Sequence, residues 1–350
     1  MSAPKLGDFC HSFSKRLSAL PRTMPQATPM EHTTTPHALP DWRSLGWQTL
    51  GSARHALGES PFWHPQEQRL YWVDIPGKQL LRAGFAGGVA APVQAWDMPS
   101  EPGCIAPASG GGWVIALRHG VFRARTWDGA LEPIATLPYD TASVRANDGK
   151  CDALGRFWVG TIDEPKASHA AELFSVDCRA GSALVQRQAG GALTANGLAW
   201  SPDNRTLYWA DTPNHVVHAW DYQLDTNTLD AHRIHLRFDA KPAAWTFDAG
   251  GYRGRPDGAA VDVQGNYWVS LFEGQRIACY ASDGTLLREI PTPAQCPTMP
   301  CFGGEDLQTL FVTTARHGRS ASELAAFPDS GAVFYLRVDT PGLPVHAFAA

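Results

Sequence analysis

Short aromatic strands recur along the chain at nearly even intervals, and they restrict the possible folds more than any other feature. Each follows a turn-like segment, and five of the six place a Trp at the same point: RLYWVDI, GGWVIAL, RFWVGTI, TLYWADT, NYWVSLF and TLFVTTA. The shared position is held by Trp72, Trp113, Trp158, Trp209, Trp268 and Phe311, at intervals of 41, 45, 51, 59 and 43 residues. A regular period of this length indicates one supersecondary unit per repeat.

Each aromatic line is followed, after a loop, by a second stretch with strand character. These stretches are KQLLRAGF, GVFRARTW, AELFSVDC, VVHAWDYQ, RIACYASDG and AVFYLRVD. Units of 40–50 residues with about four antiparallel strands each are typical of the blades of a β-propeller, which bury both sheet faces by radial stacking. We therefore predict an all-β, six-bladed β-propeller in which the repeated Trp side chains pack between blades.

The domain prediction divides the chain into two parts. Residues 1–41 are rich in Thr, Pro, Ser and His and lack the apolar core of a secretory signal, so they are expected to be a disordered extension or a stretch upstream of a true start at Met24 or Met30. Residues 42–350 are predicted to form a single propeller and catalytic domain. Its ring is expected to close with strands from both termini, 42–53 supplying an outer strand and the residues after 331 a strand and a tail.

Composition excludes several classes of partner. A formal net charge of −5 argues against nucleic acid or an acidic membrane surface, and no apolar run reaches the ~18–20 residues of a membrane span. The seven Cys are odd in number and form no CxxC pair, which favours reduced thiols in a cytoplasmic protein. We expect a monomer or homodimer that acts on a small molecule.

A second repeat, of acidic and amide side chains, runs in phase with the first. It lies eleven to thirteen residues before the aromatic position and contains Glu59, Glu101, Asn147, Asn196 and Asp257. Because the first strand of each blade lines the channel of a propeller, equivalent positions are expected to meet at one mouth of that channel. The alternative is that each is a turn residue, since NDG, NG and PDG are strong turn signals by themselves.

Carboxylates gathered in this way repel one another and lose hydration unless a cation neutralises them. The expected ligands are Glu59 and Asp257 with the amide of Asn196, and Asn147 as a further candidate. An all-oxygen set suits one divalent cation, with Ca²⁺ first and Mg²⁺ or Mn²⁺ next, while Zn²⁺ and Fe²⁺ are less suited to a site without His or Cys.

Five motifs in consistent order resemble the regucalcin/gluconolactonase family of sugar-lactone hydrolases, from about residue 50 to 318. They are LGESPFW, RANDGKCDALGRFWVGTID, NGLAWSPDNRTLYWADT, RPDGAAVDVQGNYWVSLFEGQRI and PCFGGEDLQTLFVTTAR. The resemblance implies a metal bound by Glu59, Asn196 and Asp257. It also implies that Arg145 and Asn147 bind the substrate, helped by an acidic residue at Glu164 or Asp163.

The predicted function is metal-dependent opening of aldonolactones to aldonic acids. The metal would polarise the carbonyl or activate a water, with Asp257 as the base. Trp63 and Glu101 are further candidates for the pocket wall. Two alternatives stay open at this point: another esterase or phosphotriesterase on the same metal propeller, and a calcium-binding propeller without turnover.

Overall fold

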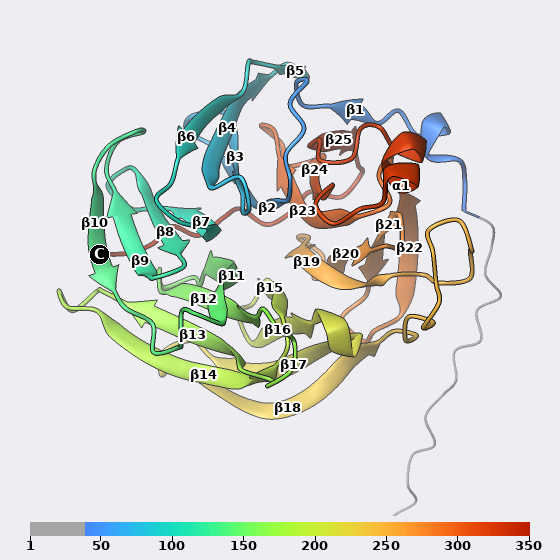
Figure 1. Ribbon diagram of the computed structural model, residues 1–350. Helices are drawn as coiled ribbons and strands as arrows, with labels where there is room; N and C mark the ends of the chain where they lie inside the picture. The colour runs from blue at the N-terminus through green and yellow to red at the C-terminus, as the bar shows by residue number, and fades with distance from the viewer. Residues whose placement is uncertain (1–38) are drawn as a thin grey trace, which may run out of the picture. The chain divides into compact units, whose positions relative to one another are not determined.

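The computed structural model describes residues 39–350, so the predicted extension, residues 1–41, lies almost wholly outside the described residues. Within the described part, six small antiparallel sheets are arranged around a central axis as a six-bladed β-propeller (Figure 1), which confirms the predicted fold class. We number the sheets blades 1–6 in chain order.

Each blade is an antiparallel sheet, with five strands in blade 1 and four in each of the others, and its strands run in the following order from the channel outwards. Blade 1 contains β2 (Gly58–His64), β3 (Arg69–Asp74), β4 (Gln79–Ala86) and β6 (Gln94–Asp97), with the short β5 (Val89–Ala90) also on β4. Blade 2 contains β7 (Pro102–Pro107), β8 (Trp113–Leu117), β9 (Gly120–Ala124) and β10 (Leu131–Ala135). Blade 3 contains β11 (Val144–Cys151), β12 (Phe157–Asp163), β13 (Ala171–Asp177) and β14 (Leu184–Ala192).

The remaining blades follow the same plan. Blade 4 contains β15 (Ala195–Trp200), β16 (Thr206–Asp211), β17 (Val216–Gln223) and β18 (Thr228–Arg237). Blade 5 contains β19 (Arg255–Val261), β20 (Tyr267–Phe272), β21 (Arg276–Tyr280) and β22 (Leu286–Pro291). Blade 6 contains β23 (Pro297–Gly303), β24 (Thr309–Thr314), β25 (Phe334–Arg337) and β1 (Gln48–Thr49). Helical turns are confined to Trp42–Ser44, Thr212–Asn214 and α1 (Ala321–Ala326) among the described residues.

Both termini close the ring, as predicted. The outer strand of blade 6 is β1, from the N-terminal end of the described chain, and it pairs antiparallel with β25. After β25 the chain crosses the channel, where Leu343 N–H donates to Val261 O at 3.1 Å and Phe348 N–H donates to Pro107 O at 2.8 Å. Blade 6 is thereby linked to blades 5 and 2 through the C-terminal segment.

The repeated aromatic residues lie in the second strand of each blade and are buried, which confirms their predicted packing role. Two of them are also fixed by the turn that precedes their strand. The Nε1–H of Trp158 donates to Asp152 at 3.0 Å, and the Nε1–H of Trp268 donates to Asp262 at 2.9 Å. The Asp residue of the DALG or DVQG turn therefore also fixes the Trp side chain in the strand that follows the turn.

The innermost strand of every blade loses its regular register at the same place. The shift follows Glu59, Pro102, Ala146, Asn196, Pro256 and Pro297 in blades 1–6. A bulge of this kind bends the strand and changes the direction of consecutive side chains. Its repetition in all six blades produces a ring of irregular backbone around the channel, which we call the bulge ring.

Two further features bear on the sequence-based predictions. Among residues 39–350, no helix is long and apolar enough to cross a membrane. Six Cys are free and buried, and Cys10 lies outside the described residues.

The half-buried His235 makes stability depend on pH. The His235 ring lies 4.8 Å from Tyr208 and 6.3 Å from Tyr267, and burial lowers its pKa to about 4. The unfolded chain takes up this proton near pH 6.5, so the free energy of unfolding should fall between pH 6.5 and 4. We expect a slope of up to ~1.4 kcal/mol per pH unit from this group. Urea unfolding of wild type and His235→Phe across that range checks the prediction, and an identical pH dependence in both contradicts it.

Candidate functional site

The bulge ring holds the predicted metal ligands. Glu59 lies in β2, Asn196 in β15 and Asp257 in β19, each at the register shift of its strand. Their side chains are buried, and the residues are 7%, 3% and 5% exposed. Residues up to about 200 positions apart in the sequence thus reach the same level of the channel.

A chain of hydrogen bonds joins the predicted substrate residues to this ring. Arg145 Nη1 donates to Asn147 Oδ1 at 3.0 Å, and Asn147 Nδ2 donates to Asn196 Oδ1 at 2.8 Å. Asn196 Nδ2 in turn donates to Thr212 Oγ1 at 2.8 Å. These contacts fix the orientation of both amides and bring three of the predicted site residues together. Asn196 also lowers the pKa of Asp257, so the Asp257 carboxyl lies near the Asn196 amide.

The carboxyl groups at the ring have raised pKa values. Burial raises the pKa of Glu59 well above its usual value, and the charges of Asp257 and Asp148 raise it further. Burial also raises the pKa of Asp257, to about 8, although Arg255 opposes the shift. Repulsion among these carboxylates thus adds to the effect of burial on their pKa values.

Asp148 was not among the predicted site residues. Its side chain is buried in β11, where Oδ2 accepts from Leu198 N–H at 2.9 Å and Oδ1 has no hydrogen-bond partner among residues 39–350. Burial raises its pKa. Asp148 is part of the RANDG motif, but the count back from the aromatic position selects the adjacent Asn147.

Lys150 supports the ring from the side of the channel interior. Its Nζ donates to Leu198 O at 2.8 Å and to Ala259 O, so one side chain from β11 holds the backbones that follow Asn196 and Asp257. Tyr267 adds a third support, because its hydroxyl donates to Gly197 O at 2.8 Å. The inner strands of blades 3, 4 and 5 are therefore held together at the ring by side chains.

The residues at the ring fit a divalent cation. Glu59, Asp148 and Asp257 offer carboxylate oxygens, Asn196 offers an amide oxygen, and one buried oxygen of Asp148 lacks a partner among residues 39–350. Oxygen donors of this type are the ligands that Ca²⁺, Mg²⁺ and Mn²⁺ prefer. Among the same residues, no three His, Cys, Asp or Glu side chains are close enough together to hold a metal by themselves.

The two acidic candidates after the GT motif have different environments. Glu164 accepts two hydrogen bonds from Arg118, at 2.8 and 2.9 Å, and lies 3.5 Å from Arg145 Nε. Asp163 instead accepts from the N–H groups of Ala167 and Ser168, at 3.0 and 2.7 Å. Glu164 thus faces the predicted substrate residues, while Asp163 stabilises the turn that follows β12.

The remaining candidates lie apart from the ring. Glu101 precedes β7 and pairs with Arg118 at 2.9 Å, so the repeat position of blade 2 at the ring is occupied by backbone of Pro102 and Gly103. Trp63 is buried between blades, stacked on Phe311 with ring centroids 6.0 Å apart.

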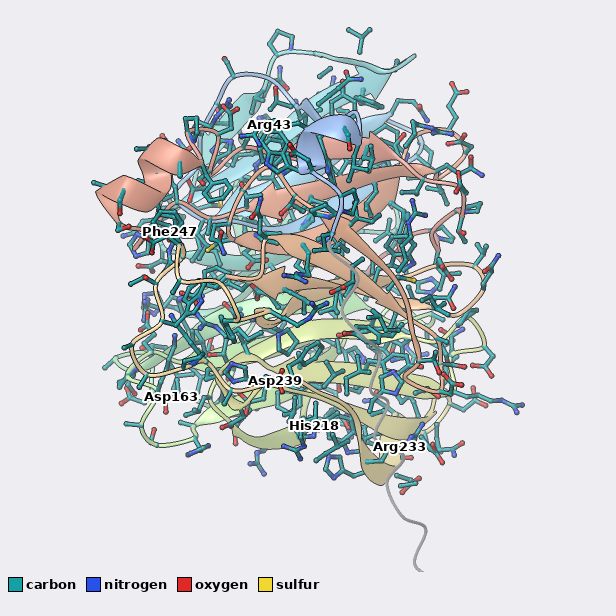
Figure 2. The ribbon with its side chains drawn as sticks, turned by 90° about the vertical axis from the view of Figure 1, so that its right-hand side faces the viewer. Arg43, Asp163, His218, Arg233, Asp239 and Phe247 are labelled. Carbon is teal, nitrogen blue, oxygen red and sulfur yellow. The ribbon has the colours of Figure 1, made fainter. Side chains whose placement is uncertain are left out.

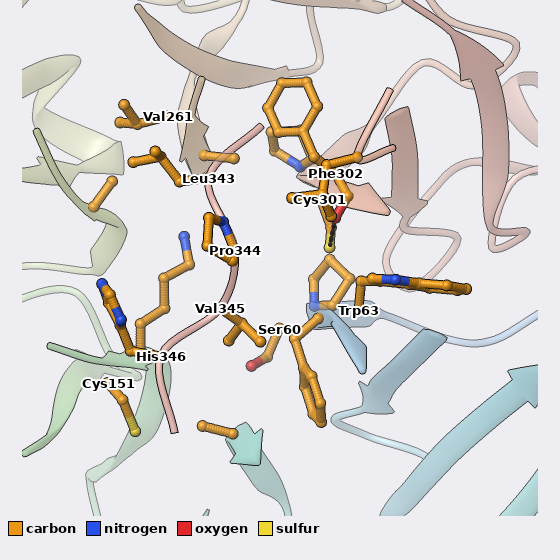
Figure 3. A pocket seen from close by; sticks show the side chains of 18 of the residues that line it. Ser60, Trp63, Cys151, Val261, Cys301, Phe302, Leu343, Pro344, Val345 and His346 are labelled. Carbon is orange, nitrogen blue, oxygen red and sulfur yellow. Dashed lines mark hydrogen bonds between the residues drawn. The ribbon is translucent and has the colours of Figure 1, made fainter. Parts of the chain in front are cut away.

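Below the bulge ring, the channel widens into an apolar cavity of about 230 Å³. Figure 3 shows it bordered by Phe302 and Val261, with Leu343 to His346 of the C-terminal segment passing across it. None of the ring carboxylates or amides lines this cavity. The polar chemistry is therefore confined to the other side of the ring.

That other side is a face built from loops of several blades. Figure 2 shows Asp163, Phe247 and helix α1 along the same side of the described domain, with His218 and Arg233 elsewhere. Asp163 leads into the β12–β13 loop, and Phe247 belongs to the long segment 238–254 before β19. We call this face, on which these segments lie, the mouth of the channel.

Comparisons with known proteins agree with this geometry. A family model described as the SMP-30/Gluconolactonase/LRE-like region matches residues 57–316. The 6-deoxy-6-sulfogluconolactonase of Pseudomonas putida is 41% identical over 293 residues, 84% of this chain and 95% of that protein. Regucalcin of Gallus gallus is 29% identical over 325 residues, 87% of this chain and 99% of that protein. A solved regucalcin from Agrobacterium tumefaciens, described as calcium-binding, has the same fold, with a TM-score of 0.77 at 24% identity over 87% of this chain and 97% of that one.

Proposed function

The chain belongs to the SMP-30/Gluconolactonase/LRE-like family, and on that premise we propose that it opens sugar lactones to aldonic acids with one divalent cation at the bulge ring. The 41% identical sulfogluconolactonase supports lactonase activity. The proposed cation is supported by one observation: buried carboxylates and an amide gather at one level of the channel. Burial raises the pKa values of these carboxyl groups, and mutual repulsion adds to the effect for Glu59 and Asp257.

Glu59, Asn196 and Asp257 would hold the cation. When bound, it supplies positive charge that polarises the lactone carbonyl or acidifies a water molecule. Ca²⁺ is the first choice among the ions that suit these donors, followed by Mg²⁺ and Mn²⁺.

The chain's own groups carry out the remaining steps. Asp257 accepts a proton from the attacking water, and a positioned acceptor of this kind typically contributes about 10²–10⁴-fold to the rate. Arg145 and Asn147 orient the sugar, and the Arg145–Asn147 hydrogen bond fixes the amide beforehand. Glu164 keeps Arg145 and Arg118 in place at the mouth.

A panel of esters tests the reaction class. Lactone opening is followed by pH-stat titration of the metal-loaded protein with glucono-1,5-lactone, a pentonolactone, 6-deoxy-6-sulfogluconolactone, phenyl acetate and a phosphotriester. The proposal expects the sugar lactones to have the highest kcat/KM. Faster turnover of phenyl acetate or the phosphotriester would assign the site to a different hydrolase class.

A further inference from the structure

The charged side chains around the mouth form two groups, and in the first every cation has a carboxylate partner. Arg118 bonds to both Glu101 and Glu164, and Arg145 lies 3.5 Å from Glu164. Lys78 also lies 4.0 Å from Glu101, so three cations face two carboxylates on this side of the mouth. Each of these cations has a carboxylate within 4.0 Å.

The second group carries excess positive charge. One carboxylate, Glu273, accepts three cations: Arg255 at 2.7 Å, Lys241 at 2.8 Å and Arg319 at 3.0 Å. Arg319 also lies 3.6 Å from Glu323. Three cations therefore face two acids on the side of the mouth formed by blades 5 and 6.

Lys166 adds another cation beside this second group. Its ammonium makes no hydrogen bond and no ion pair with any side chain in residues 39–350. The residue is exposed, yet partial desolvation of the ammonium and the charges of Arg255 and Arg145 lower its pKa. The charge of Asp257 opposes these effects, so Lys166 lies within electrostatic reach of the ring. We call Lys166, Lys241, Arg255 and Arg319 the basic wall.

The backbone holds Lys166 in position. The residue has a positive φ of 52°, in a turn where its N–H donates to Asp163 O at 2.9 Å. The Asp163 carboxylate accepts from the two N–H groups that follow Lys166, which closes the turn. The lysine stem therefore starts from a fixed point on blade 3, the blade that also carries Arg145.

We propose that the basic wall binds an anionic substituent of the sugar lactone, at the end remote from the carbonyl that is opened. This inference rests on the proposed lactonase function and names the substrate class more closely. Lys166 has an unpaired ammonium, and the nearby Arg255 shares the Glu273 carboxylate with Lys241 and Arg319. Such a group of cations favours a sulfonate or phosphate over a hydroxyl. The neutral end of the lactone would lie towards the ring and the first group.

The test compares two lactones that differ in this one charge. For wild type loaded with metal, kcat/KM should be higher for 6-deoxy-6-sulfogluconolactone than for glucono-1,5-lactone. Lys166→Met should reduce kcat/KM for the sulfonated lactone about tenfold, mainly through KM, because the variant loses a charge-assisted hydrogen bond to the substrate. The neutral lactone should change by less than about twofold. Added salt should weaken turnover of the sulfonated lactone only.

Lys78→Met is the matched control. Lys78 lies in the equivalent β3–β4 hairpin of blade 1, also with a positive φ, but 4.0 Å from Glu101. It should leave the ratio between the two lactones unchanged. If Lys166→Met also lowers kcat/KM for a phosphorylated lactone, the basic wall recognises the negative charge. If it lowers kcat/KM for the sulfonated lactone alone, the basic wall recognises the sulfonate itself.

Two results would overturn the inference. One is a wild type that prefers the neutral lactone, and the other is a Lys166→Met variant that affects both lactones equally or neither. Both leave lactonase activity in place, so the proposed function survives. If metal-loaded wild type opens none of the lactones, the proposed function fails and the inference fails with it.

Discussion

Asp257→Asn should reduce kcat/KM for lactone opening by about 10³-fold or more while the propeller stays folded. The substitution keeps the shape of the side chain but removes both a proton acceptor and an anionic ligand. Loss of a general base alone typically costs about 10²–10⁴-fold. Steady-state kinetics under pH-stat titration, with the cation in excess, measures the effect.

The same substitution should not destabilise the metal-free protein. Burial and the neighbouring Asp148 raise the pKa of Asp257 to about 8, which means that its ionised form is disfavoured in the fold. A neutral amide relieves that cost, so the Tm without metal should be unchanged or higher. Asp230→Asn, at an exposed position on β18, serves as the control and should retain full activity. Wild-type activity in Asp257→Asn would remove Asp257 from the mechanism.

Removal of divalent cations should abolish lactone opening and lower the Tm. A ligand present at 100 times its Kd stabilises the folded state by about 2.7 kcal/mol. For a domain of this size the loss corresponds to roughly 3–5 °C in Tm. Activity and thermal unfolding are measured after treatment with a chelator and again after each of Ca²⁺, Mg²⁺ and Mn²⁺ is restored.

A variant separates binding at the ring from adventitious binding. Asn196→Leu removes the amide ligand from β15 without adding a charge, so cations should no longer raise its Tm. Lys78→Met, away from the ring, should respond to cations as wild type does. A chelated wild type with undiminished activity and Tm would contradict the proposed metal dependence.

The sequence was informative about the fold because large aromatic side chains carry its repeat. A Trp or Phe fills the same wedge between blades in every unit, so Trp72 and Phe311 mark equivalent strands that lie far apart in the chain. The ring positions followed from the same phase, which brought Glu59, Asn196 and Asp257 to one level of the channel.

Counting residues from the aromatic repeat was not enough to select site residues where the local backbone decides the direction of a side chain. Counting back from Trp113 selected Glu101, but the bulge of blade 2 begins one residue later, and Glu101 turns to Arg118. Counting also selected Asn147 and passed over Asp148, because two consecutive residues at a bulge can both reach the channel. Register shifts of one residue are not visible in a period of 41–59 residues.

The charge of the mouth could not be predicted from the sequence at all. Lys166, Arg255 and Arg319 come from loops and strands of different blades, and only the closed ring brings them near Glu273. Loop lengths vary between repeats, so no common phase relates these residues. Their excess positive charge is a property of the assembled propeller.

Anomalous diffraction from crystals grown with Mn²⁺ tests the central claim most directly. The account predicts one strong peak at the bulge ring, with oxygen atoms of Glu59, Asn196 and Asp257 at ligand distances of about 2.0–2.6 Å. A peak bound by other residues, or none at the ring at a concentration that supports activity, would contradict it.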